Sequence, residues 1–306
     1  MVDEDLFQLQ REVLCHASLN SRHAFMTCRR SYFRRPELVV LPSGTYVSGM
    51  TTCKCGYCVH HVRRYLYEQR KRIARVEKFI RQEGLHPTLM TLTLPHKVSD
   101  NLKYLRLKLH EGTKKLLATS GKTANKLIRR INQRVGNIGY LLRNEVTFTN
   151  NGWNCHCHIG NLNKQLYSEE EKNQIAGEFA RILKDSGFFL SRLDEYKIEK
   201  RNGLIHFVDD FANVGYLAKF DKNNPVYLAQ SNPSKYVEFA QSFNVSEKIP
   251  LIKFKGYLMS KINKTLNLSE EKKSEEELEW IEIPEFLIHC PKEEIENWLI
   301  NRSSCS

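Results

Sequence analysis

Two histidines and a glutamate, His156, His158 and Glu145, stand in a short segment whose pattern predicts a β-hairpin. The segment at 145–159 reads EVTFTNNGWNCHCHI. Asn151-Gly152 between two alternating runs is a strong hairpin signal, because a two-residue type I′ turn needs positive φ at both central positions. Two imidazoles and one carboxylate on one face of a sheet would form a divalent-metal site, and these ligands alone do not specify the metal.

The expected turn decides which side chains face each other. A turn centred on Asn151-Gly152 places Glu145 opposite His158, with Cβ atoms of directly opposed residues about 4.5–5.5 Å apart. The two histidines are two residues apart and share that face. A three-residue loop would slip the pairing and would move Glu145 off it. The other face carries apolar side chains: Val146, Phe148, Cys155, Cys157 and Ile159. The alternative interpretation of His-Cys-His is two exposed strand histidines without a function.

A tyrosine and a lysine three residues apart form a second candidate pair. Residues 209–220 read DDFANVGYLAKF and predict a helix, on which Tyr216 and Lys219 share one face. Tyrosine can form covalent intermediates, but its hydroxyl pKa of about 10 demands a polarised electrophile or a nearby cation. A metal on the histidines and Glu145 would polarise a phosphodiester, and Lys219 would stabilise negative charge. The alternative for Tyr216, one of 13 tyrosines, is a packing aromatic.

Nine cysteines, with the crowded segment CKCGYC, indicate a reducing compartment rather than a secreted disulfide framework. Cys53, Cys55 and Cys58 could supply three thiolates to a structural Zn²⁺, with Cys28, His60 or His61 as the fourth ligand. No second CxxC is present, so buried thiols without metal are the alternative.

The charge is high and unevenly placed. The 306 residues carry a formal net charge of +12, with basic residues crowded at 63–81 and 103–134 and acidic residues at 270–296. Such a basic body favours a polyanionic partner, although each cluster could also be a solvated helix face. No apolar run approaches the roughly 18 residues needed to span a bilayer, and the start lacks the features of a signal peptide. We therefore expect a cytoplasmic protein with no membrane partner.

The elements that must position these residues follow from the hydrophobic pattern. We expect strands at about 88–94, where Thr91 and Thr93 face away from Met90 and Leu92, and one or two more in 188–207. Ser168-x-x-Glu171 is a capping-box signal. The expected helices are 62–82, 101–119, 122–133 and 168–185, and the hairpin strands are 138–149 and 153–162. This order predicts an α+β fold in which helices cover an antiparallel sheet.

Three segments together resemble rolling-circle replication initiators of the HUH endonuclease superfamily, above all plasmid-type Rep proteins. They are LMTLTL at 89–94, EVT and NCHCHIG within 145–160, and GYLAKF at 215–220. They occur in the order and spacing of that family, and the resemblance covers about residues 50–225. The HxH hairpin with Tyr-x-x-Lys is specific in combination, whereas the TLTL strand is weak alone. The cysteine-bearing N-terminal region is also similar to that of plasmid-type members.

The resemblance implies a nuclease and strand-transferase domain with an RRM-like palm at 85–225. A basic region with a zinc knuckle would precede it at 1–84, and a partly helical accessory region would follow at 226–306. It implies a protein that nicks one strand of single-stranded or supercoiled origin DNA and becomes joined to the 5′-phosphate. In this sequence Tyr216 would be the nucleophile assisted by Lys219. His156, His158 and Glu145 would hold Mg²⁺ or Mn²⁺, and a host helicase is a possible further partner.

The chain departs from the family pattern in two places. Asn154-Cys155 replaces the histidine and proline that often precede the HxH histidines. The turn before Tyr216 holds Ala212 and Asn213, where plasmid-type members tend to carry a glutamate for termination, although Asp210 could act as a base if the helix begins late. The second departure weakens the expectation for the termination step and leaves the nicking step intact.

Three other functions compete with replication initiation. An HUH-type transposase would use the same chemistry. A non-catalytic, zinc-containing DNA- or RNA-binding protein would use only the cysteines and the basic helices. A mononuclear iron oxygenase would use the two histidines and the carboxylate, but would leave Tyr216, Lys219 and the net charge without a purpose.

Overall fold

The computed structural model forms two compact units. The first comprises Met1–Leu19 and Cys55–Ser269, and the second comprises Asn20–Lys54 and Glu270–Ser306. Whether the expected ranges 1–84, 85–225 and 226–306 are separate functional domains stays a prediction. The structure describes residues 3–17, 32–41, 44–50, 53, 55–121, 124–188, 203–211, 214–220, 223–243, 249–255, 258–265 and 280–282.

The second unit contains a small antiparallel sheet in the order β2-β1-β8. Its strands are β1 (Tyr32–Leu41), β2 (Gly44–Met50) and β8 (Trp280–Glu282).

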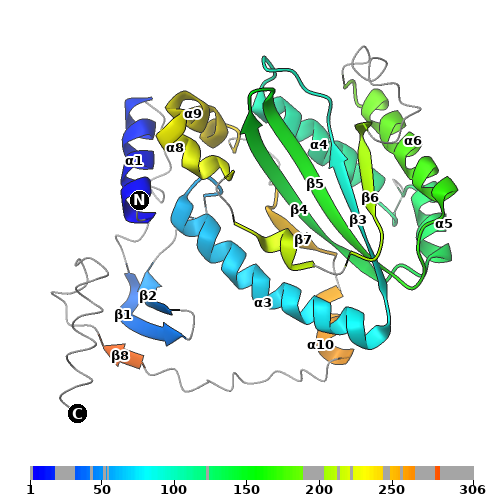
Figure 1. Ribbon diagram of the computed structural model, residues 1–306, viewed down its shortest axis with the longest axis horizontal. Helices are drawn as coiled ribbons and strands as arrows, with labels where there is room; N and C mark the ends of the chain where they lie inside the picture. The colour runs from blue at the N-terminus through cyan, green and yellow to red at the C-terminus, as the bar shows by residue number, and fades with distance from the viewer. Residues whose placement is uncertain are drawn as a thin grey trace. The chain divides into compact units, whose positions relative to one another are not determined.

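The first unit is built on a five-stranded sheet in which every neighbouring pair is antiparallel, in the order β6-β3-β5-β4-β7 (Figure 1). The strands are β3 (His86–Thr93), β4 (Gly139–Thr149), β5 (Gly152–Asn163), β6 (Ile205–Val208) and β7 (Ile252–Phe254). This sheet and its helices confirm the predicted α+β class with an antiparallel sheet.

The two faces of this sheet differ, as the alternation of side chains predicts. Met90 and Leu92 of β3 and Cys157 of β5 are buried on one face. There α4 (Leu102–Leu116) packs on β5, and Figure 1 shows it behind the strands. Its N-cap Asn101 accepts a hydrogen bond from the Tyr104 N–H, which satisfies one of the free donors of the first turn. The opposite face carries the histidines.

The hairpin of β4 and β5 has a different turn from the predicted one. Thr149 pairs with Gly152, so Asn150 and Asn151 form the turn, and Glu145 lies directly opposite His156 rather than His158. Gly152 has φ +92°, whereas Asp210 is the only described non-glycine residue with positive φ, so the turn is not type I′. The partner of each residue is displaced by two positions. Because side chains alternate with a period of two, Glu145 keeps the expected face.

Four helices of the first unit lie close to the predicted ranges 62–82, 101–119, 122–133 and 168–185. The long helix α3 (Val59–Glu83) ends at Gly84, whose φ of +57° gives a left-handed cap. It is followed along the chain by α4, by α5 (Lys126–Arg134) and by α6 (Glu169–Asp185). Further helices are α1 (Asp3–His16), α8 (Leu228–Ser231), α9 (Pro233–Gln241) and α10 (Leu258–Thr265). None of the helices in the described part is long and apolar enough to cross a bilayer.

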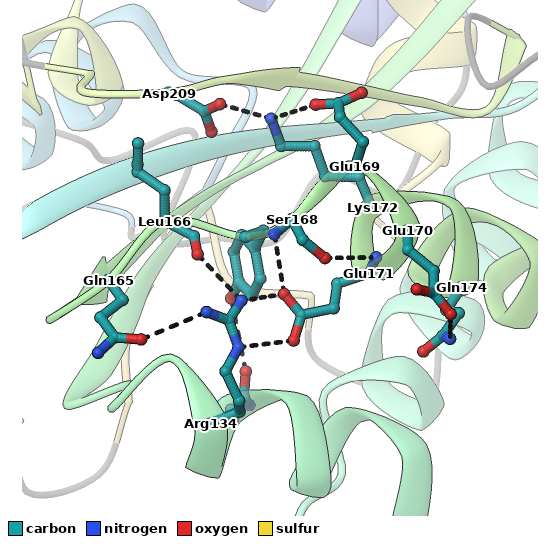
Figure 2. A network of polar contacts seen from close by, with 12 residues as sticks. Arg134, Gln165, Leu166, Ser168, Glu169, Glu170, Glu171, Lys172, Gln174 and Asp209 are labelled. Atoms are coloured by element: carbon teal, nitrogen blue, oxygen red, sulfur yellow. Dashed lines mark hydrogen bonds and ion pairs between the residues drawn. The ribbon is translucent and has the colours of Figure 1, made fainter.

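A polar network ties α5, α6 and the end of β6 together (Figure 2). Ser168 and Glu171 form the predicted capping box at the start of α6, and Arg134 of α5 pairs with Glu171. Lys172 bridges Glu169 and Asp209, the residue that follows β6. The chain that leads to Tyr216 is thereby anchored to a capped helix.

The helix predicted over 209–220 does not form. Asp209 and Asp210 make a turn instead, in which Asp210 has φ +46° and receives a hydrogen bond or ion pair from His86. Among the described residues of this segment, only Val214–Ala218 is helical, as the short 3₁₀ segment η2. Aspartate side chains compete with helical hydrogen bonds by binding elsewhere, here to Lys172 and His86, and this accounts for the lost first turn.

Candidate active site

The two histidines and the glutamate lie together on one face of the sheet. The ring centroids of His156 and His158 are 5.8 Å apart. The Nε2 atom of His158 is 2.8 Å from Oε2 of Glu145, and its Nδ1 atom is 3.0 Å from Oγ1 of Thr91 on β3. Thr91 therefore orients the ring of His158 so that its other nitrogen points at the carboxylate.

The electrostatics of this cluster favour a carboxylate beside a neutral imidazole. Burial raises the pKa of Glu145, but the hydrogen bond to His158 and the positive charges of Arg143 and Lys219 outweigh it and lower that pKa to about 2. Burial lowers the pKa of His156 to about 4, with a contribution from His158. At neutral pH Glu145 is thus ionised and His156 is uncharged, which are the forms that bind metals.

Tyr216 lies directly beside this cluster. Its ring centroid is 5.7 Å from that of His158, and the two rings meet edge to face. The Nζ atom of Lys219 lies 4.3 Å from the centre of the Tyr216 ring. Lys219 directly follows the 3₁₀ segment, and its N–H donates to the Tyr216 carbonyl at 3.1 Å, so the two residues lie together as their spacing predicts. Tyr216 is half-buried. The structure thus brings together a phenol, an ammonium group, two imidazoles and a carboxylate.

The segment that carries Tyr216 is held by polar contacts from two sides. From α3, Glu77 accepts the Gly215 N–H at 2.8 Å, and Arg70 donates to the Ala218 carbonyl at 3.2 Å. From β4, Arg143 donates to the carbonyl of Tyr216 at 3.3 Å. These contacts replace the helical hydrogen bonds that so short a segment lacks.

Close packing also sets the height of this segment above the sheet. A Cβ atom on Gly160 of β5 would lie 3.3 Å from Cδ1 of Leu217 and 3.4 Å from Cδ2 of Leu141. The absence of a side chain at Gly160 lets Leu217 reach the sheet, and Tyr216 next to it then meets His158. The significance of this glycine lies in a contact between segments far apart in the sequence, which the local pattern did not reveal.

Arg143 is a second residue that the sequence reasoning missed. Its side chain is 4 % exposed, donates to Oε1 of Glu145 at 3.1 Å, and has a buried Nε atom without a hydrogen-bond partner in the described part of the chain. A signal was present in the sequence: Arg143 precedes Glu145 by two positions on the same strand, so it shares the histidine face.

The donor set fits a divalent cation, although the described residues include no group of three His, Cys, Asp or Glu side chains already arranged to hold an ion. His158 bonds Glu145 directly. Nδ1 of His156 is buried and lacks a hydrogen-bond partner within the described chain. An ionised carboxylate and an uncharged imidazole with an unsatisfied nitrogen are the groups that a cation would satisfy.

The cysteines of the predicted zinc knuckle are only partly described. Cys55 and Cys58 are buried and joined by a tight turn, in which the Cys58 N–H donates to the Cys55 carbonyl at 3.1 Å, and Cys58 is the N-cap of α3. Cys53 is buried but belongs to the second unit, and Cys28 lies outside the described residues. The zinc site therefore stays a prediction.

Two further polar residues, Asp210 and His206, lie outside the cluster around Tyr216. Asp210 contacts His86 at the start of β3, and the Asp210 side chain is 62 % exposed. His86 lies five residues before Thr91, which places it about 17 Å from Thr91 along the strand. His206 pairs with Thr91 from β6 and is exposed. Neither residue contacts Tyr216 among the described interactions.

Comparison of the chain with protein-family models, with curated proteins and with solved structures gives no match. The residues of the site and their geometry therefore carry the functional argument.

Proposed function

We propose that this chain is a metal-dependent DNA endonuclease and strand transferase of the HUH type that initiates rolling-circle replication. The observation that carries the proposal is the contact between the Tyr216 ring and His158, whose Nε2 atom faces Glu145. A nucleophile beside a candidate metal site is what an attack on a phosphodiester requires. The clustered basic residues supply the attraction for a polyanion.

In the proposed reaction the phenol oxygen of Tyr216 attacks a backbone phosphorus. The bond from phosphorus to the 3′ oxygen breaks, the tyrosine becomes esterified to the 5′-phosphate, and the phenol proton ends on the departing 3′ oxygen. A divalent cation on His156, His158 and Glu145 would polarise the phosphate. Lys219, next to the ring, stabilises the negative charge that develops on the phenol oxygen.

The surrounding residues keep this arrangement ready for reaction. Thr91 orients the ring of His158 through Nδ1, so its Nε2 atom faces the Glu145 carboxylate with which it would share the cation. Arg143 fixes both the carboxylate and the backbone of the nucleophile, which reduces the reorganisation needed for attack.

The test is incubation of the protein with a pool of random single-stranded oligonucleotides and Mn²⁺, followed by SDS electrophoresis. We expect a protein–DNA adduct that survives SDS with the wild type and disappears with Tyr216→Phe. Tyr104→Phe is the matched control, because Tyr104 stacks on Phe188 and belongs to α4 on the other face of the sheet. DNA binding without any adduct would favour a non-catalytic DNA-binding protein.

A further inference from the structure

A hollow of about 400 Å³ lies between α3 and the tyrosine segment. Arg70, Ile73, Ala74 and Glu77 line it from α3, and Tyr216 and Lys219 line it from the other side. The proposed nucleophile therefore forms part of its wall. Whatever occupies this hollow lies next to the atom at which chemistry would occur.

The sequence of α3 explains the hollow. Ala74 is exposed and is the smallest side chain on its face of the helix. Its neighbours three and four residues away are Arg70, Lys71, Glu77 and Lys78. A methyl group surrounded by long side chains leaves a notch, and three of those four side chains are basic.

The wall combines the chemical features that a nucleotide needs. Ala74 and the Tyr216 ring provide apolar and aromatic surface for a planar base, above the buried Ile73. Arg70 and Lys219 provide positive charge for phosphate. Arg70 and Glu77 are also tied to the backbone of the tyrosine segment, so the wall is held in place on both sides.

We propose that this hollow is a nucleotide subsite, which takes the base of a nucleotide adjacent to the phosphate attacked by Tyr216. The inference rests on the proposed function, because it assigns the occupant as part of the DNA substrate. It adds a role for α3: the helix would position the strand as well as the nucleophile.

The test uses fluorescein-labelled (dT)₁₀ and an abasic ten-nucleotide strand with the same phosphates, both measured by fluorescence anisotropy in EDTA. Ala74→Leu fills the notch without changing charge. Gln82→Leu is the matched control, since Gln82 is an exposed, uncharged residue of the same helix outside the hollow. Circular dichroism verifies that both variants retain the helix content of the wild type.

We expect Ala74→Leu to weaken (dT)₁₀ binding by about ten-fold, as expected for the loss of one base contact, and to change abasic-strand binding by less than about two-fold. Gln82→Leu should resemble the wild type with both strands. Equal binding of (dT)₁₀ by Ala74→Leu and wild type, an equal loss with both strands, or no binding of (dT)₁₀ by wild type would overturn the subsite.

This experiment and the adduct test can refute the subsite and the nuclease independently of each other. Binding in EDTA requires neither metal nor nucleophilic attack. A base-selective loss in Ala74→Leu together with no adduct in Mn²⁺ would retain a base-binding hollow and refute the nuclease. Normal adduct formation by the wild type, together with unchanged (dT)₁₀ binding by Ala74→Leu, would support the nuclease and refute the subsite.

Discussion

The guanidinium group of Arg143 lies 3.3 Å from the carbonyl oxygen of Tyr216. The same group donates to Oε1 of Glu145 at 3.1 Å, so one side chain joins the candidate ligand carboxylate to the backbone of the candidate nucleophile. It is nearly inaccessible to solvent, with 4 % of the side chain exposed. The distance between the two halves of the site therefore depends on a buried ion pair.

Arg143→Ala should lower the free energy of unfolding by about 3–5 kcal/mol, because it leaves the Glu145 carboxylate buried beside a cavity without its ion-pair partner. Urea denaturation measures this loss. The control is Arg64→Ala, which removes an exposed ion pair with Glu68 on α3 and should cost less than about 1 kcal/mol. Equal losses in the two variants would mean that Arg143 does not have the structural role described.

Gly160→Val should displace the tyrosine segment, because even a single Cβ atom at this position meets Leu217 at 3.3 Å. We expect a loss of about 1–3 kcal/mol in unfolding free energy and a loss of adduct formation. The control is Gly177→Ala in α6, where an added Cβ has no neighbour within 4 Å and should stabilise the helix by about 0.5–1 kcal/mol. Native adduct formation by Gly160→Val would show that the contact does not position Tyr216.

His156→Ala and His158→Ala should each weaken Mn²⁺ binding by more than about ten-fold, since each removes a proposed ligand. Titration of Mn²⁺ followed by electron paramagnetic resonance measures the effect. His206→Ala serves as the control because His206 belongs to the same sheet and pairs with Thr91, but it is not among the proposed ligands. The same weak binding in all three variants, or unchanged binding in the first two, would place the metal elsewhere.

The stability contributed by Glu171 should depend on pH. Burial raises the pKa of this carboxyl, but hydrogen bonds from Arg134 and Ser168 outweigh it, so the pKa is lower in the folded protein than its ordinary value. Its contribution is therefore fully present above the unfolded-state pKa of about 4.3 and declines as the pH falls through the lower, folded-state pKa.

Unfolding free energies of wild type and Glu171→Gln, measured from pH 7 to pH 3, test this directly. The wild type should be more stable by a constant amount above about pH 5, and the difference should shrink at lower pH. Glu170→Gln is the control in the same helical turn, where the carboxylate accepts from Gln174. A difference that grows as the pH falls would reverse the assigned sign.

Much of the fold follows from local patterns in the sequence. Alternation places Thr91 with the histidines and Met90 with the core, and the Ser168–Glu171 capping box starts α6 as predicted. Even the incorrect hairpin turn leaves Glu145 on the histidine face, because its pairing slips by two positions rather than one. A period of two residues tolerates a slip of two positions, whereas a slip of one would have moved Glu145 to the other face.

The remainder depends on contacts between residues that are distant in the sequence. The 3₁₀ geometry around Tyr216 is set by Glu77, Arg70 and Arg143, which come from a helix and a strand more than 70 residues away. The Asp209-Asp210 pair is compatible with a helix start in the sequence, but in the structure Lys172 binds Asp209 and His86 binds Asp210. No local propensity contains these interactions, so neither the 3₁₀ segment nor the hydrogen bond from Arg143 to the Tyr216 carbonyl could be predicted, although the strand period does place Arg143 on the histidine face.

The most direct measurement of the central claim is mass spectrometry of the SDS-resistant adduct formed with single-stranded DNA and Mn²⁺. After digestion with nuclease and protease, we predict a nucleotide 5′-phosphate on the peptide that contains Tyr216, and no such peptide from His158→Ala. An adduct on another residue, or an adduct on Tyr216 that forms at the native rate in His158→Ala, would contradict the account.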